Sequence, residues 1–148
     1  MSARRARIAA ALAAALCGAG VRASPQQDYM LYCMGCHGDQ AQGVPGKVPP
    51  LAGSIALFMR SPEGRNYLLR VPGAANSALS DVQLAAVLNW LAQRYPPAAG
   101  APQRAQGAPF TAAEVAQLRH TPLADVRERR REVVRALAAS GPAPPAEY

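Results

Sequence analysis

Short stretches of apolar residues at helical spacing dominate this chain, and none shows the apolar–polar alternation typical of a half-buried strand. The clearest helix is expected over about 80–95. Its apolar face consists of Leu84, Val87, Leu88 and Leu91. Ser80 and Gln83 form a capping box at the start of this helix, and Pro96 ends it because proline has no backbone N–H to donate.

Three more helices are expected before this one. Ser24 and Gln27 form a capping box for the first, which leads into a cysteine-containing segment. The apolar segment 54–59 is long enough for one or two turns. A third helix opens at Ser61, which is followed by proline and glutamate, and it is expected to end before Pro72.

After residue 95 the composition changes. Residues 96–110 are rich in proline, alanine and glycine, without regular apolar spacing, and this composition indicates an extended linker. Thr111 and Glu114 then form a capping box for a short helix through Leu118. A second helix is expected from Pro122 or Leu123 to about residue 139.

The N-terminal residues are typical of an export signal. Three arginines precede the apolar stretch 8–16, and Val21 and Ala23 place small side chains where a signal peptidase cleaves. Cleavage is expected after Ala23, and an uncleaved membrane anchor is the alternative. Lipidation of Cys17 is disfavoured, because the leucine before it stands where a small residue is expected.

The predicted fold class is therefore all-α. The expected organisation is a signal peptide, 1–23; a helical domain, 24–95; a linker, 96–110; a C-terminal helical extension, 111–140; and a frayed tail, 141–148. The core of a domain of about 70 residues is small, so a bound group would add much to its stability.

Removal of the signal peptide changes the charge of the protein. The chain has 16 Lys and Arg against 9 Asp and Glu; four arginines leave with residues 1–23, so 12 remain against 9, a net charge of +3. The high pI of the full chain therefore does not indicate nucleic-acid binding, and aromatic side chains for base stacking are scarce.

The last predicted helix is the most basic part of the mature chain. It carries Arg127, Arg129, Arg130, Arg131 and Arg135. Asp125, Glu128 and Glu132 partly offset these charges, which favours a solvated face with local ion pairs. The alternative is a docking element for an acidic partner or an anionic membrane surface.

The residues that can bind a cofactor are concentrated in one run, Cys33-Met34-Gly35-Cys36-His37. The pattern C-x-x-C-H is the attachment signature of a c-type haem: the two thiols form thioether bonds to the porphyrin, and the histidine is the proximal iron ligand. A structural zinc site is disfavoured, because it needs four ligands and the chain offers few others. A thioredoxin-like redox pair would need a βαβ pattern, which the surrounding sequence lacks.

The region 24–95 resembles a class I cytochrome c domain. Besides the attachment motif, residues 49–53 (Pro-Pro-Leu-Ala-Gly) are similar to the P-x-L-x-G loop of that family, and the segment from Leu79 onward is similar to its C-terminal helix. The resemblance implies a helical fold around one covalently attached haem. It also implies that the carbonyl of Pro49 accepts a hydrogen bond from His37.

The chain departs from the family at the distal iron ligand. The loop before the last helix of these domains usually supplies a methionine, and here Val71 stands in that region. Met59 is the best substitute, since it is the only methionine after the attachment motif, although it could simply pack in the core. His120, Lys47 and Asn76 are weaker candidates, and an open distal side is the remaining possibility.

These features favour a periplasmic one-electron carrier, or the cytochrome subunit or partner of a periplasmic dehydrogenase. The expected partners are periplasmic redox proteins that donate or accept the electron; membrane contact is possible and not required. The alternative is a haem-ligand binding protein or weak peroxidase with an open distal iron site. Peroxidase chemistry normally needs a distal acid or base, and no histidine other than His37 lies near the motif.

Overall fold

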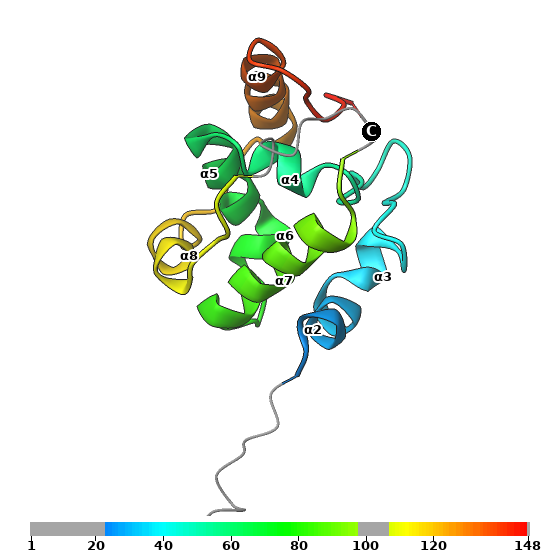
Figure 1. Ribbon diagram of the computed structural model, residues 1–148, viewed down its shortest axis with the longest axis vertical. Helices are drawn as coiled ribbons and strands as arrows, with labels where there is room; N and C mark the ends of the chain where they lie inside the picture. Colours follow the sequence, from blue (N-terminus) through cyan, green and yellow to red (C-terminus); the bar gives the residue numbers. More distant parts are fainter. Residues whose placement is uncertain (1–22, 98–106, 148) are drawn as a thin grey trace, which may run out of the picture.

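The computed structural model describes residues 23–97 and 107–147, and these residues are helical, with no strand beyond an isolated bridge between Val44 and Val48 (Figure 1). The expected signal peptide, apart from Ala23, and the middle of the expected linker, 98–106, lie outside the described residues. None of the helices in the described ranges is long and apolar enough to cross a membrane. The all-α fold class predicted from the sequence is confirmed.

Most helices begin where their capping residues predict. The helices are α2 (Pro25–Tyr32), α3 (Met34–His37), α4 (Ile55–Phe58), α5 (Pro62–Arg70), α6 (Pro72–Ala75), α7 (Asp81–Arg94), α8 (Ala112–Leu118) and α9 (Val126–Ala138). Both predicted capping boxes in the domain form: Ser24 with Gln27 at α2, and Ser80 with Gln83 at α7. At α8 the Thr111 side chain accepts a hydrogen bond from the backbone N–H of Glu114.

Two boundaries differ from the sequence-based prediction. The last helix begins at Val126 rather than at 122–123, because the side chain of Asp125 accepts a hydrogen bond from the backbone N–H of Glu128 and caps it there. The short helix α6 was not expected. It begins at Pro72, whose fixed φ suits the first position of a helix.

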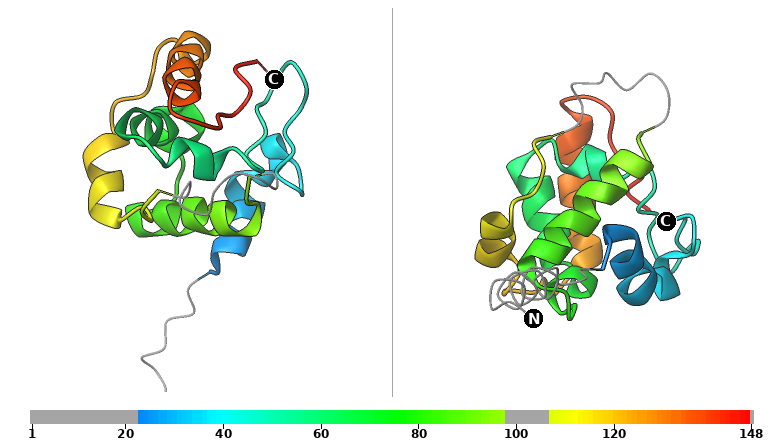
Figure 2. Two further views of the ribbon diagram at one scale, coloured as in Figure 1. Left: turned by 45° about the horizontal axis from the view of Figure 1, so that its top comes forward. Right: turned by 60° about the horizontal axis from the view of Figure 1, so that its bottom comes forward.

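The first and last helices of the domain, α2 and α7, pack against each other (Figure 2). The rings of Tyr29 and Trp90 lie 5.6 Å apart at this contact. The buried carboxylate of Asp28 accepts hydrogen bonds from the side-chain amide of Gln83, so the capping residue of one helix also holds the other. This pair of helices forms one side of the domain core.

The C-terminal extension is part of the same core. Helix α8 packs on α7, and α9 packs on α5 (Figure 1). The side chain of Asn89 on α7 exchanges two hydrogen bonds with the backbone of Phe110, at 2.8 and 3.0 Å. The buried guanidinium of Arg119 donates to the carbonyl oxygens of Ser77 and Leu79. The extension is therefore fixed to the domain by both apolar and polar contacts.

Helix α9 carries the ion pairs expected of a solvated face. Arg129 pairs with Glu132, and Arg131 pairs with Glu128. Arg130 is different, because its side chain is on the buried face and only 2% of the residue is exposed. Arg130 therefore does not belong to the solvated face on which the sequence places the arginines of this helix.

The segment after α9 also differs from the expected frayed tail. Ala143 and Ala146 pack against the core, and Arg130 donates to the carbonyl of Pro145. Glu147 forms an ion pair with Arg131. These contacts give residues 141–147 a fixed path along α9.

Candidate haem site

Two adjoining cavities of about 140 and 230 Å³ lie between the helices. Both are partly open to the surface, and concave, largely apolar pockets with a few polar groups are the usual form of a cofactor site. The smaller one, here called the cysteine cavity, is bounded by Cys33, Cys36 and apolar residues of α7. The larger one, the arginine cavity, is bounded by Arg130 and residues of α4 and α5. The residues common to both linings are His37, Leu51, Ile55, Leu68, Val71 and Gly73.

The two thiols stand at the mouth of the cysteine cavity. Both are free, with Cys33 half-buried and Cys36 exposed. The backbone N–H groups of Cys36 and His37 donate to the carbonyl of Cys33, which winds the motif into the single turn of α3. Burial raises the pKa of the Cys33 thiol to about 11, so this thiol is protonated near neutral pH when no haem is attached.

The orientation of His37 is set by the proline loop. Its Nδ1 lies 3.0 Å from the carbonyl oxygen of Pro49, which accepts the ring N–H and leaves Nε2 as the basic nitrogen. Burial lowers the pKa of His37, and the contact with Pro49 opposes this effect without cancelling it. The imidazole is therefore neutral near pH 7, which is the state that binds a metal.

Tyr29 fixes the chain immediately after His37. Its hydroxyl donates a hydrogen bond of 2.6 Å to the carbonyl oxygen of Gly38, and burial raises the pKa of Tyr29 to about 12. The following turn brings the N–H of Gly43 within 2.8 Å of the carbonyl oxygen of His37. Gly43 has φ of +69° and a Cβ at this position would overlap the backbone of Val48, so only glycine fits.

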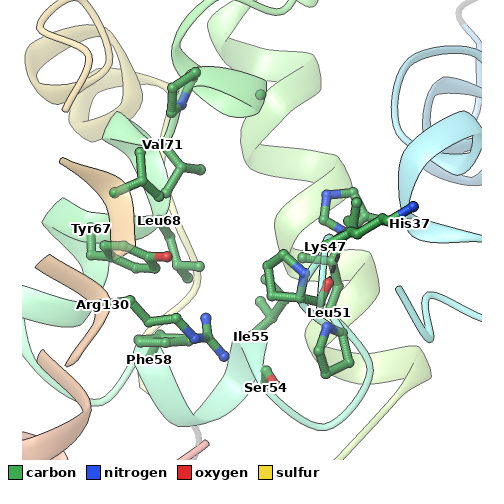
Figure 3. Close-up of a pocket in the computed structure, with 16 residues that line it drawn as sticks. His37, Lys47, Leu51, Ser54, Ile55, Phe58, Tyr67, Leu68, Val71 and Arg130 are labelled. Carbon is green, nitrogen blue, oxygen red and sulfur yellow. Dashed lines mark hydrogen bonds between the residues drawn. The ribbon is translucent and has the colours of Figure 1, made fainter. Parts of the chain in front are cut away.

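The side of the cavity opposite His37 is formed by α5 and α9. Figure 3 shows Tyr67, Leu68 and Val71 across the space from His37, with the guanidinium group of Arg130 directed into it. Val71 lines both cavities, so the residue that departs from the expected methionine position does face the site. The Val71 side chain presents only methyl groups to the two cavities.

The structure does not bring Met59 to His37. Met59 is buried, and it lines a separate small cavity with Asn89 and Ala92 of α7, near Gly107. It therefore lies outside the two cavities that His37 lines, and this placement does not support the expectation that Met59 is the distal iron ligand. The reason is packing: Ile55 and Phe58 of α4 face the arginine cavity, whereas Met59 contacts α7.

The other candidates for the distal position are also placed elsewhere. His120 is exposed between α8 and α9, and Asn76 is exposed after α6. Lys47 lines the arginine cavity close to Pro49, on the same side as His37. No cluster of three or more histidine, cysteine or acidic residues that could hold a metal ion occurs in the described ranges.

The arrangement suits a flat, largely apolar group held at one edge by two thioether bonds. Apolar side chains line both cavities, and His37, whose Nδ1 is held by Pro49 and whose Nε2 is left as the basic nitrogen, lies in both linings. An all-helical fold that encloses such a space beside a C-x-x-C-H turn defines a protein that carries covalently attached haem.

Comparisons with known proteins agree with this class. No protein-family model matches the chain. Two curated relatives, both named cytochrome c-552 and both from Thermus thermophilus, are 37% identical to it over 106 residues. The match covers 59% of this chain and 78% and 69% of the two relatives. The chain belongs to the c-type cytochromes, and it is an electron-transfer protein with covalently attached haem rather than an enzyme.

Sequence reasoning missed the residues that α5 and α9 contribute to the site. The sequence places Tyr67 and Leu68 within the helix that opens at Ser61, and Arg130 among the charged residues of the basic helix, without indicating that any of them lines the site. A signal for Arg130 was present, because it lies four residues after Val126 and four before Val134, on the apolar face of α9. A charged residue on an otherwise apolar helix face is a candidate for contact with a buried anion.

Proposed function

We propose that this cytochrome is a periplasmic carrier with a single haem, attached through Cys33 and Cys36 and ligated by His37. Its donor or acceptor is a periplasmic redox protein, such as a dehydrogenase to which it is a partner or subunit. The periplasmic location rests on the signal-peptide features of residues 1–23, together with the oxidising compartment that haem attachment requires in bacteria.

The observation that carries this proposal is the contact between His37 and Pro49 beside the two free thiols. Haem supplies a one-electron iron couple when it is bound. The protein's part is to hold the imidazole in one orientation through Pro49, to make it a better donor, and to exclude water with the apolar lining of both cavities. A rigid and dry environment reduces the rearrangement that accompanies each electron transfer.

The surface beside the thiols suits contact with a redox partner. Cys36 is exposed, and so are the apolar side chains of Leu31 and Tyr32 on the preceding helix. A haem attached at Cys36 would therefore have an edge near the surface, next to apolar groups that a partner can cover. This geometry provides a short path for the electron.

The test is to produce the full chain in a host that matures c-type cytochromes and to examine the mature protein. We expect one haem per chain by the pyridine haemochrome assay, loss of residues 1–23, and a reversible one-electron wave in voltammetry. A protein that carries no covalent haem, or that shows no reversible wave, would contradict the proposal.

A second property, small-ligand binding, is favoured by the lining opposite His37. Among the described residues that line the two cavities there is no methionine, and His37 is the only histidine. We therefore expect the reduced protein to bind carbon monoxide under native conditions, with a shift of its main haem absorption band. A methionine–iron charge-transfer band in the oxidised protein, with no binding of carbon monoxide, would exclude an open distal side.

A further inference from the structure

We propose that Arg119 is a positioning residue for the haem site. Together with the rest of the connecting turn between α8 and α9, residues 119–123, it holds the segment 71–79 closed and so slows the entry of small ligands. The inference rests on the proposed haem attachment and on the open distal side, and it concerns how that side is reached from solvent. The resemblance to class I domains ends at residue 95, so it assigns no role to this turn.

The segment 71–79 forms one wall of the cysteine cavity. It runs from the end of α5 to just before the cap of α7, and its cavity-lining residues are Val71, Gly73, Ala74, Ser77 and Leu79. Val71 lies across the space from His37 (Figure 3). Gly73 lines both cavities and is also exposed, so a single layer of chain separates the site from solvent at this point.

The packing of this segment is weak. Between Val71 and Leu79 the sequence is Pro-Gly-Ala-Ala-Asn-Ser-Ala. Burial stabilises in proportion to the apolar area removed from water, so these small side chains add little. The backbone hydrogen bonds of α6 shape the segment from within and do not tie it to the rest of the fold. Contacts from another part of the chain are therefore needed to keep the wall in place.

The connecting turn holds the start of the segment. The backbone N–H of Leu123 donates to the carbonyl oxygen of Arg70, the last residue of α5, at 2.9 Å. The Nε of Arg70 donates in return to the carbonyl oxygen of Thr121 at 2.6 Å. These two hydrogen bonds fix the turn to the residue immediately before Val71.

Arg119 holds the end of the segment. Its two terminal nitrogens donate to the carbonyl oxygens of Leu79 and Ser77, at 2.8 and 2.7 Å. The same guanidinium lies 3.1 Å from the carboxylate of Asp81, at the start of α7. Arg119 is 5% exposed, so these hydrogen bonds are protected from competing water. One short turn of the C-terminal extension therefore bridges both ends of the wall.

The test measures how fast carbon monoxide binds to the reduced, haem-loaded full chain after flash photolysis. Arg119→Gln removes the guanidinium, and Arg119→Lys keeps the charge without the planar fork that reaches both carbonyl groups. Arg65→Gln is the matched control. Arg65 also fastens the extension to α5, but its partners, which include Glu114 and the carbonyl of Ala108, lie outside the segment 71–79.

We expect carbon monoxide to bind roughly tenfold faster to Arg119→Gln than to the unmodified protein. The loss of a hydrogen bond to a charged group raises the population of an open segment by about this factor. Arg119→Lys should show a smaller increase, and Arg65→Gln should bind at the rate of the unmodified protein. The same rate in Arg119→Gln and Arg65→Gln would overturn the inference, whether or not it differs from the unmodified rate.

Hydrogen exchange measured by mass spectrometry tests the same contact without a ligand. The backbone N–H groups of residues 73–79 should exchange faster in Arg119→Gln than in the unmodified protein. Those of α2, which lies outside the contacts of the connecting turn described above, serve as the internal reference. If Arg119→Gln does not mature, Arg119→Lys takes its place in both measurements. Unchanged exchange of residues 73–79 relative to α2 overturns the inference.

The design separates this inference from the proposed function. Absence of covalent haem from the unmodified chain would count against the proposed function. Normal haem with unaltered rates in the Arg119 variants counts only against the role of Arg119. Haem-loaded proteins that all fail to bind carbon monoxide, variants included, would overturn the open distal side and this inference, and would leave the electron carrier standing.

Discussion

Replacement of both Cys33 and Cys36 by serine is expected to abolish covalent haem attachment completely. Serine hydroxyls do not add to the porphyrin vinyl groups under the conditions in which thiols do, so no thioether bond forms. Haem should then be removed from the variant by acidified acetone, whereas it should remain with the unmodified polypeptide. Loss of the bound group should also destabilise the fold, because the apolar linings of the two cavities then lack a partner.

The two single serine variants and a glycine control separate the contributions of the individual thiols to haem attachment. Cys33→Ser and Cys36→Ser alone should each keep one thioether bond and a lower yield of haem protein. Gly35→Ala is the matched control, since it preserves the C-x-x-C-H spacing and its added Cβ meets no atom within 4 Å. Covalent haem in the double serine variant would show that other residues attach it.

Gly64→Ala is expected to cause a large loss of stability, although it adds only one methyl group. Gly64 lies in the first turn of α5, where its N–H donates to the side chain of Ser61. A Cβ at this position would overlap the carbonyl group of Phe58 at the end of α4. The resulting shift should cost at least about 2 kcal/mol in the free energy of unfolding, although alanine favours a helix by about 1 kcal/mol.

The reason is the close approach of α4 and α5. These two helices supply Ile55, Phe58, Tyr67 and Leu68 to the arginine cavity, so a change in their spacing also alters the site. Chemical denaturation of the haem-loaded protein measures the effect, and Gly35→Ala should leave the stability unchanged or slightly raised. Equal stability of the Gly64→Ala variant and the unmodified protein would show that α4 and α5 can move apart at little cost.

Local chemistry explains why much of the fold could be predicted from the sequence. Capping depends on residues three apart in the chain, so Ser24 with Gln27, and Ser80 with Gln83, identify the starts of α2 and α7 without any knowledge of packing. The attachment motif is equally local. It identifies the class of cofactor from five consecutive residues, in agreement with the cytochrome c-552 relatives.

The features that the sequence did not reveal depend on contacts between distant segments. Met59 is close to the site in sequence, but its side chain packs toward α7 and Gly107. The number of residues between Met59 and the motif does not reveal on which side of α4 the Met59 side chain lies. Arg130 is far from the motif in sequence and lies in the same cavity as His37. The charge pattern of the sequence indicates that α9 lies at the surface. Only the packing of α9 on α5 shows that one of its arginines, Arg130, is buried.

Helix α9 completes a site that begins at the other end of the mature chain. The attachment motif is near the beginning of the mature chain, and Val126 and Arg130 near its end, so the last wall of the site is synthesised well after the thiols. A chain in which α9 has not yet docked leaves the cavity open on that side for haem to enter. Haem attachment before α9 docks would therefore meet a site that is open on this side, and docking would then complete its wall.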